Sequence, residues 1–231
     1  MTGILPPVMH VESGSFAEYV TVPAEGFIEP KPANLSFEQA ASAGLAAVTA
    51  LACVEHVSPS EGATVLIVGA TGGVGSYAVQ FANARGATVV ASALPQDEPW
   101  IRDLGADEIA NYSSDVPGAV RERHPDGIDG LIVAVQVGDG FAELAELVRD
   151  GGKVASTVGG ADAEALAVRG VGAENVLGQS DPARFGTVLG WAAEGTLTVP
   201  ITKTYAFDEV PEALGLVGKR SSRGKLAITI P

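Results

Sequence analysis

The sequence predicts an α/β fold built around a doubly wound parallel sheet. Three observations predict it: short runs of apolar, β-branched residues recur along the chain, amphipathic segments with helical spacing separate them, and glycine-rich turns join the two. Strands that alternate with helices pair in parallel, and such sheets bind ligands at the carboxyl ends of their strands. The functional site is therefore expected in the turns that follow the predicted strands.

The other predicted elements are arranged around the segment Thr64–Ala84. Val65–Val68 predicts a strand buried on both faces, and apolar residues fall at helical spacing from Val74 onward. Glycines between them would serve a tight turn, the approach of a pyrophosphate and close helix–strand packing. The predicted cofactor contacts here are Gly69, Ala70, Thr71, Gly72, Gly73, Val74 and Gly75. This pattern predicts a Rossmann dinucleotide-binding unit, although Ala70 departs from the strict GxGxxG pattern; a glycine-rich turn without a ligand is the alternative.

Further elements are predicted on both sides of this unit. Strands are expected at Ser15–Thr21, Thr88–Ala91, Glu108–Asn111, Ile128–Val135, Lys153–Val158 and Leu226–Ile230, with short β-like pieces at Thr196–Ile201 and Thr204–Phe207. Helices are expected at Glu98–Leu104, Val116–Arg123, Phe141–Val148 and Val210–Val217, and from the N-cap Asp181 to Glu194. Ser36, with Gln39 as its capping-box partner, predicts the start of an alanine-rich helix that ends near Ala52.

Composition excludes several classes of partner. The chain of 231 residues has a formal net charge of −14, which argues against nucleic acids and anionic membranes, because both attract positive surfaces. Cys53 is the single cysteine, so no intramolecular disulfide can form and a cytoplasmic location is expected. The sequence shows no uninterrupted apolar stretch of membrane-spanning length and no secretory signal pattern.

Four stretches resemble the medium-chain dehydrogenase/reductase superfamily, in its zinc-independent quinone oxidoreductase-like branch. They are GSFAEYVTVPA at Gly14–Ala24, VGATGGVGSYAVQFA at Val68–Ala82, LGADEIANY at Leu104–Tyr112, and the tail from Glu194 with EGTLTVPITKTYAFDEVPEAL and RGKLAITI. The resemblance implies an NAD(P)H-dependent oxidoreductase, usually with NADPH, that delivers hydride to a quinone, an enone or a small carbonyl compound.

The same resemblance implies a division of the chain into three parts. Residues 1–35 correspond to a remnant of a GroES-like catalytic β domain, residues 36–196 to the Rossmann domain, and residues 197–231 to a segment that returns to the remnant. Most of the N-terminal catalytic domain of the family is missing from this sequence, and with it much of the substrate-binding part. A nucleotide-binding protein without turnover is therefore the alternative to an active enzyme.

The sequence gives no indication of a metal site or a hydrolase site. His10, His56 and His124 are scattered and have no ligand-spaced cysteine or carboxylate nearby, and Cys53 cannot form the four-cysteine lobe of the zinc-containing branch. No GxSxG motif is present, which removes the signature of an α/β-hydrolase nucleophile. No catalytic residue is assigned, since this branch mainly positions its cofactor.

Cofactor selectivity depends on the end of the second Rossmann strand. An acid there holds the adenosine ribose in NAD enzymes, but this chain has Ser92, which would leave room for a 2′-phosphate. The loop that follows, Pro95–Glu98, contains no Lys or Arg. The small, neutral Ser92 therefore favours NADPH as the cofactor, and NADH is possible.

The resemblance also implies roles for residues outside the turn. Thr49 would lie near the nicotinamide, Tyr112 beside the adenosine, Gly159 and Gly160 near the nicotinamide amide, and Arg223 in an RGK motif close to the cofactor. Ordinary packing or a solvated charge is the alternative for Thr49, Tyr112 and Arg223. The family often has Asp-x-x-Gly after the fourth strand, where this chain has Val133 and Gln136.

The segment Ala165–Gly178 predicts an assembly. Val168, Val171 and Val176 are expected to form a sixth, apolar edge strand, and in this family the corresponding edge pairs with its twofold mate. Unpaired edge groups favour such pairing, so a homodimer is expected, with a solvated loop and a monomer as the alternative.

Overall fold

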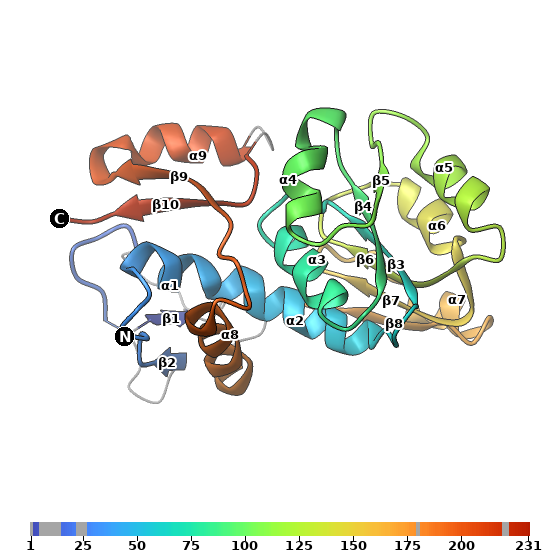
Figure 1. The fold of residues 1–231 in the computed structure, drawn as a ribbon, viewed down its shortest axis with the longest axis horizontal. Helices are drawn as coiled ribbons and strands as arrows, with labels where there is room; N and C mark the ends of the chain where they lie inside the picture. The colour runs from blue at the N-terminus through green and yellow to red at the C-terminus, as the bar shows by residue number, and fades with distance from the viewer. Residues whose placement is uncertain (1, 5–14, 22–26, 179–180, 219–221) are drawn as a thin grey trace. The chain divides into compact units, whose positions relative to one another are not determined.

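The computed structural model describes residues 2–4, 15–21, 27–178, 181–218 and 222–231. The chain forms two compact units, one of residues 49–177 and one that combines residues 1–48 with residues 178–231 (Figure 1). The first unit is fully described, and it contains the predicted dinucleotide-binding turn.

Residues 49–177 fold around a six-stranded parallel sheet with the strand order β5-β4-β3-β6-β7-β8. Its strands are β3 (Thr64–Val68), β4 (Thr88–Ser92), β5 (Glu108–Ala110), β6 (Ile128–Val133), β7 (Val148–Ser156) and β8 (Gly172–Asn175). The order reverses between β3 and β6, so the carboxyl ends of these two strands border the switch point where doubly wound sheets bind ligands. The predicted α/β class and parallel Rossmann-like sheet are confirmed.

Helix α2 (Leu45–Val57) leads into β3, and further helices connect the consecutive strands of this sheet. The connecting helices are α3 (Gly75–Asn83), α4 (Glu98–Asp103) after the 3₁₀ turn η1 (Pro95–Asp97), α5 (Val116–Arg123), α6 (Gly140–Ala145) and α7 (Ala163–Ala167). Aspartates cap α5 and α7: the side chain of Asp115 accepts a hydrogen bond from the N–H of Gly118, and the side chain of Asp162 accepts one from the N–H of Ala165. Such caps satisfy backbone donors that a helix leaves free at its start.

The sheet has a buried apolar layer on each face. On one face, Leu66 and Val68 of β3 belong to a buried cluster with residues of α5, α6 and α7, such as Val120 and Leu144. On the other face, α2 lies so close that a Cβ at Gly130 would stand 2.4 Å from Cγ1 of Val57. Glycine in β6 thus permits this close contact, and both faces exclude water from the sheet.

The second unit contains two small sheets. The strand β1 (Thr2–Ile4) pairs antiparallel with β2 (Phe27–Glu29), and β9 (Ile201–Ala206) pairs parallel with β10 (Lys225–Thr229). Its helices are α1 (Phe37–Ala43), α8 (Pro182–Glu194) and α9 (Val210–Gly218), the last preceded by the 3₁₀ turn η2 (Phe207–Glu209). Helix α1 packs against β10 and α8 packs against β2. These pairs do not establish a GroES-like remnant, which stays a prediction.

Two predictions for the N-terminal part are corrected. Residues 15–18 form bends and residues 19–21 have no regular structure, in place of the predicted strand, because no neighbouring strand pairs with them in the described part of the chain. Residues 22–24 of the resemblance motif lie outside the described residues. The single helix predicted up to Ala52 is two helices, interrupted at Gly44, whose ψ of −104° is not helical. The capping box is confirmed: Gln39 N–H donates to Ser36 Oγ at 3.1 Å, and Ser36 N–H donates to Gln39 Oε1 at 2.9 Å.

Predicted boundaries also differ around β7. The predicted helix Phe141–Val148 ends at Ala145, and β7 already begins at Val148 instead of Lys153. The glycines after Asp150 therefore lie within an irregular strand: the register between β6 and β7 shifts between Ile128 and Gly130. A bulge absorbs the extra residues, which a local sequence pattern does not distinguish from a helix stop.

The predicted sixth strand is shorter and differently composed. It covers Gly172–Asn175 and contains none of the three valines. Val168 follows α7 and is 87% exposed, whereas Val171 and Val176 flank the strand and are 2% and 6% exposed. The two flanking valines are therefore core residues of this unit rather than parts of an apolar edge.

One helical stretch in the described part of the chain, Phe37–Val57, is long and apolar enough to cross a membrane by length and composition. It spans α1 and α2, and 72% of its apolar window is buried inside the protein. Burial of that degree is typical of a core helix of a folded domain.

Candidate functional site

The turn after β3 begins with a glycine that the backbone requires. Gly69 has a φ of +81°, which side chains rarely adopt, and a Cβ there would lie 3.0 Å from Cβ of Val135. This residue redirects the chain from the buried strand into the turn. Ala70, which follows, is fully buried, so its side chain faces the protein and only its backbone can contribute to a ligand site.

The last glycine of the turn is required for packing. A Cβ at Gly75 would lie 2.1 Å from the carbonyl oxygen of Gly69 and 2.7 Å from the Cα of Ala70. The first residue of α3 thus touches the end of β3 with no space for any side chain. This is the close helix–strand approach that the spacing predicts.

Gly72, in contrast, is not required by the fold. Its backbone is not in the left-handed region, and a Cβ would meet only the carbonyl oxygen of Gly69, at an ordinary contact distance of 3.4 Å. Space is therefore open above this residue on the outside of the turn. A glycine that neither backbone conformation nor internal packing requires fits the close approach of a pyrophosphate.

Backbone donors are available at the same place. Helix α3 begins after Val74 without a side-chain cap, and the N–H groups of Gly73 and Val74 have no acceptor among the described residues. Thr71, Gly72, Gly73 and Val74 are all partly exposed. Free N–H groups at the positive end of a helix dipole bind anions, so the turn fits the pyrophosphate of a dinucleotide.

Ser92 at the end of β4 supports the turn from inside. Its Oγ accepts a hydrogen bond of 3.0 Å from the N–H of Gly69, and only 1% of the residue is exposed. The prediction placed Ser92 beside the adenosine ribose as a small residue that leaves space. In the structure its hydroxyl is directed at the turn. There it accepts the hydrogen bond of the N–H of Gly69, the glycine of the turn that has a left-handed conformation.

Comparison with known proteins places the chain in a family. A family model described as zinc-binding dehydrogenase matches residues 104–228. The chain belongs to this family, which is part of the medium-chain dehydrogenase/reductase superfamily. The resemblance seen in the sequence is therefore confirmed.

Individual relatives of this chain agree with the family match. The chain is 32% identical to a zinc-type alcohol dehydrogenase-like protein of Staphylococcus epidermidis over 155 residues, 64% of this chain and 46% of that protein. It is 34% identical to the putative quinone oxidoreductase YhfP of Bacillus subtilis over 148 residues, 62% of this chain and 44% of that protein. The chain thus matches less than half the length of these curated relatives.

A solved structure shows the same similarity in three dimensions. The crystal structure of an NAD-dependent alcohol dehydrogenase aligns with a TM-score of 0.83 at 28% sequence identity, covering 94% of this chain and 66% of that one. Nearly all of this chain therefore has a counterpart in a dehydrogenase, while a third of the dehydrogenase has none here.

Other predicted positions of the chain lie at the same edge of the sheet as the turn. Gly159 and Gly160 follow β7 with φ values of +80° and +94°, and a Cβ at Gly160 would lie 3.2 Å from the ring of Phe141. Tyr112 follows β5 and is 50% exposed. Because β3, β5 and β7 are parallel, the loops after their carboxyl ends lie along one edge, as the prediction requires.

Thr49 and Arg223 lie elsewhere in the chain. Thr49 is 5% exposed within α2, so its side chain belongs to the protein interior. Arg223 belongs to the unit of residues 1–48 and 178–231, where its carbonyl oxygen accepts a hydrogen bond of 2.8 Å from Oγ1 of Thr202. The proposed contacts of both residues with a cofactor stay predictions.

Gln136 and Ser156 are structural residues of the site that the sequence did not identify. Gln136 Nε2 donates to the carbonyl oxygen of Val158 at 3.1 Å, and Ser156 Oγ donates to that of Gly159 at 2.7 Å. These bonds hold the loops after β6 and β7. The sequence carries a signal at Gln136, which departs from the family's Asp-x-x-Gly, but the partner of its side chain lies 22 residues away.

The two described histidines have carboxylate partners, and the cysteine is buried. His56 Nδ1 lies 2.8 Å from Glu174 and His124 Nε2 lies 3.2 Å from Glu108, while His10 lies outside the described residues. No group of three or more His, Cys, Asp and Glu side chains that could hold a metal occurs among the described residues. Cys53 is fully buried, and burial raises the pKa of its thiol to about 12, so it is a poor nucleophile.

Proposed function

We propose that this chain is the dinucleotide-binding part of an NAD(P)H-dependent oxidoreductase that transfers hydride to a quinone, an enone or a small carbonyl compound. The observation that carries the proposal is the difference between the glycines of the turn. Gly69 and Gly75 are required by the fold, whereas Gly72 is not and leaves open space beside free N–H groups. Membership in the dehydrogenase family supports the reaction class.

The residues of the turn would bind and position the cofactor. The N–H groups of Gly73 and Val74 would donate hydrogen bonds to the pyrophosphate, and Gly72 would permit its approach to the backbone. Ser92 and Gln136 hold the loops that surround this position. When bound, the nicotinamide supplies the hydride, so the protein's contribution is binding and orientation rather than a catalytic base.

Several further properties belong to this proposal. We expect a metal-independent cytoplasmic enzyme whose partner is a small-molecule substrate, and we expect no nucleic acid or membrane partner. The net charge of −14 supports the last two expectations, because it disfavours polyanionic surfaces.

Calorimetric titration of the chain with NADH and NADPH, followed by a steady-state assay of their oxidation, tests the proposal. Quinones, enones and small aldehydes serve as acceptors, with and without EDTA. Binding of at least one cofactor together with its acceptor-dependent oxidation supports the proposal. Failure of both cofactors to bind at millimolar concentration would contradict it.

A second function is favoured by one observation. The chain matches only 46% and 44% of the two bacterial relatives, so more than half of each relative has no counterpart in the match. The chain would then bind the dinucleotide without turnover. Tight cofactor binding without oxidation by any acceptor would distinguish this function from the first.

The homodimer is also a proposal. The strand β8 lies at one end of the sheet order and pairs only with β7 among the described strands. An open edge of this kind favours isologous pairing with a second copy. Light scattering at micromolar concentration would give twice the mass of 23.4 kDa for a dimer, and a mass of one chain would contradict the proposal.

A further inference from the structure

The strand order of the sheet divides the proposed site into two halves. A doubly wound sheet binds a dinucleotide across the point where the strand order reverses, and each half of the sheet takes one nucleotide. The adenosine ribose lies at the end of the second strand of the fold, which is β4 here. The nicotinamide nucleotide is therefore expected over the other half, at the carboxyl ends of β6, β7 and β8.

The loop after β7, residues 157–161, has backbone groups that suit a carboxamide. The N–H groups of Gly159 and Gly160 and the carbonyl oxygen of Gly160 have no partner among the described residues. Gly160 is exposed, and a Cβ at Gly159 would meet nothing within 4 Å. Because a carboxamide offers N–H donors and a carbonyl acceptor, this backbone is able to bind the amide of a nicotinamide from one side.

Side chains from three neighbouring strands hold this loop. Gln136 after β6 and Ser156 at the end of β7 donate hydrogen bonds to two of its carbonyl oxygens. The third side chain is that of Asn175, the last residue of β8. Its Oδ1 accepts from the N–H of Ala161 at 3.1 Å, and its Nδ2 donates to the carbonyl oxygen of Ala161 at 2.9 Å. One planar amide thus fixes both the position and the orientation of the residue that follows Gly160.

Ala161 depends on Asn175 for its hydrogen bonds. It is 6% exposed, and neither its N–H nor its carbonyl oxygen has another partner among the described residues. Without the amide of Asn175, both groups would reach water only if the loop moved outward. Asn175 itself is exposed, so a smaller residue there leaves no cavity. A change at Asn175 is therefore expected to displace the loop rather than to unfold the unit.

We propose that Asn175 is a positioning residue for the nicotinamide half of the cofactor. It acts through Ala161: by fixing this residue it holds the backbone of Gly159 and Gly160 in the position that binds the carboxamide. This inference rests on the proposed dinucleotide site, and it adds the edge strand β8 to the elements that build the site.

Titration calorimetry of the whole chain with NADH and with ADP-ribose tests the inference, because ADP-ribose lacks the nicotinamide. NADPH and the 2′-phosphorylated form of ADP-ribose are a second pair, and the pair that binds more tightly is used for the variants. We expect Asn175→Ala to weaken binding of the dinucleotide about fivefold or more and binding of its truncated form less than about twofold. A general loss of stability would weaken both compounds alike.

A second variant removes only one of the two hydrogen bonds. In Asn175→Asp the carboxylate still accepts from the N–H of Ala161, but it has no hydrogen to donate to the carbonyl oxygen, which it repels instead. We expect the same selective loss of dinucleotide binding. Circular dichroism shows whether Asn175→Ala is folded, and if it is not, Asn175→Asp decides alone.

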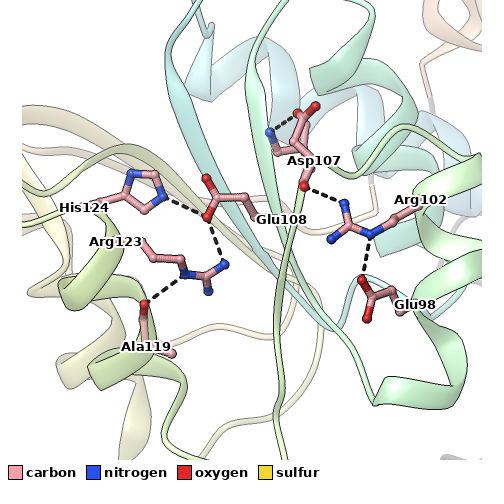
Figure 2. A network of polar contacts seen from close by, with 8 residues as sticks. Glu98, Arg102, Asp107, Glu108, Ala119, Arg123 and His124 are labelled. Atoms are coloured by element: carbon pink, nitrogen blue, oxygen red, sulfur yellow. Dashed lines mark hydrogen bonds and ion pairs between the residues drawn. The ribbon is translucent and has the colours of Figure 1, made fainter.

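Asn111 provides the matched control at the other edge of the sheet. As Figure 2 shows, β5 begins in a network in which Glu108 contacts Arg123 at 2.9 Å, and this network anchors the strand independently of Asn111. After the strand, Asn111 Oδ1 accepts from the N–H and the Oγ of Ser113 at 3.0 Å and 2.8 Å. Asn111→Ala therefore frees a loop over the adenosine half, and it should leave the ratio of the two affinities unchanged.

Three outcomes would overturn the inference and leave the proposed function intact. They are equal losses for both compounds in a folded Asn175 variant, no loss for either compound, and a change of the ratio in Asn111→Ala as large as in Asn175→Ala. A wild-type protein that binds the truncated compound as tightly as the dinucleotide would also overturn it, because the loop would then contribute nothing to binding. Absence of binding by all four compounds would overturn the proposed function and this inference with it.

Discussion

The two units of the chain differ in how completely they bury their apolar residues. In residues 49–177 the sheet interior is closed on both faces, and β-strand residues such as Leu66 and Ile132 are 0% exposed. The other unit has two-stranded sheets, and Phe37, Leu214 and Val217 are 72%, 51% and 53% exposed. An open groove of about 720 Å³ also runs along β10 beside α1.

This difference indicates where the chain's own function resides. A six-stranded sheet with helices on both faces is sufficient to fix a turn at its carboxyl edge, whereas a two-stranded sheet has little stability of its own. The precision of the Gly69–Gly75 turn therefore derives from the first unit. Stability and cofactor binding are expected to respond to changes in that unit and to tolerate changes on the open surface of the other.

The largest effect is expected from the packing glycine of the turn. Gly75→Ala places a Cβ 2.1 Å from the carbonyl oxygen of Gly69, so backbone must move. We expect a loss of about 3 kcal/mol in the free energy of unfolding and loss of cofactor binding. Urea denaturation followed by circular dichroism measures the free energy of unfolding, and titration calorimetry measures cofactor binding.

Gly72→Val is the matched control, because a Cβ at this position makes only an ordinary van der Waals contact, 3.4 Å from the carbonyl oxygen of Gly69. It should change the free energy of unfolding by less than about 1 kcal/mol and still abolish dinucleotide binding, since the side chain occupies the space for the pyrophosphate. A folded Gly72→Val protein that binds NADH or NADPH within a few-fold of the wild type would show that the site is misplaced. A stable Gly75→Ala protein would show that the turn is not rigid.

The outcomes for individual elements show which features a sequence can predict. The strand β4 and the helices α5 and α8 were predicted within one residue, because their caps and apolar spacing are local: Asp115 and Asp181 each precede a proline-containing first turn. The bulge in β7 and the break at Gly44 depend on pairing and packing with distant segments. Such contacts leave no periodic pattern in the sequence.

The same limit applies to the site. The positions of Gly69, Gly72 and Gly75 were predictable because a phosphate-binding turn needs glycines at fixed spacing. The role of Ser92 was not, because its bond joins it to a residue 23 positions earlier in the chain. The arginines Arg102 and Arg123 were likewise visible in the sequence, but their contacts at the start of β5, with Asp107 and Glu108, were not.

The second largest effect is expected at Ser92. Ser92→Ala removes the acceptor of the Gly69 N–H and should cost about 1–2 kcal/mol of unfolding free energy, because a partly buried donor is left unsatisfied. Affinity for both dinucleotides should fall together, by a few-fold. Ser92→Asp would bury a carboxylate and should also weaken the binding of both cofactors. A selective loss of NADPH binding in Ser92→Asp would instead show that residue 92 faces the ribose.

The third prediction concerns Cys53, which reports how tightly the unit of residues 49–177 is packed. Burial raises the pKa of its thiol to about 12, so at pH 9 only about one thiol in a thousand is ionised. Alkylation by iodoacetamide at pH 9 should be at least a hundredfold slower in the native protein than in 8 M urea. The pKa of the Cys53 thiol is higher in the folded protein than in the unfolded protein. The buried neutral thiol therefore contributes fully to stability below about pH 8.5, and this contribution declines as the pH rises toward 12. Rapid alkylation of the native protein would contradict the closed packing around α2.

The smallest effect is expected on the open surface of the other unit, at Phe37. Its ring is exposed, and Lys31 Nζ lies 5.1 Å from the ring centroid. Phe37→Ser removes this contact at an exposed site, so the free energy of unfolding should fall by only about 0.5 kcal/mol, and cofactor affinity should not change. Urea denaturation and calorimetry measure both quantities, with Ile132→Ala in the sheet core as the contrasting variant, for which a loss of about 2–5 kcal/mol is expected. A loss in Phe37→Ser that approaches that of Ile132→Ala would mean that α1 is covered in solution, and the contrast between a closed and an open unit would then be wrong.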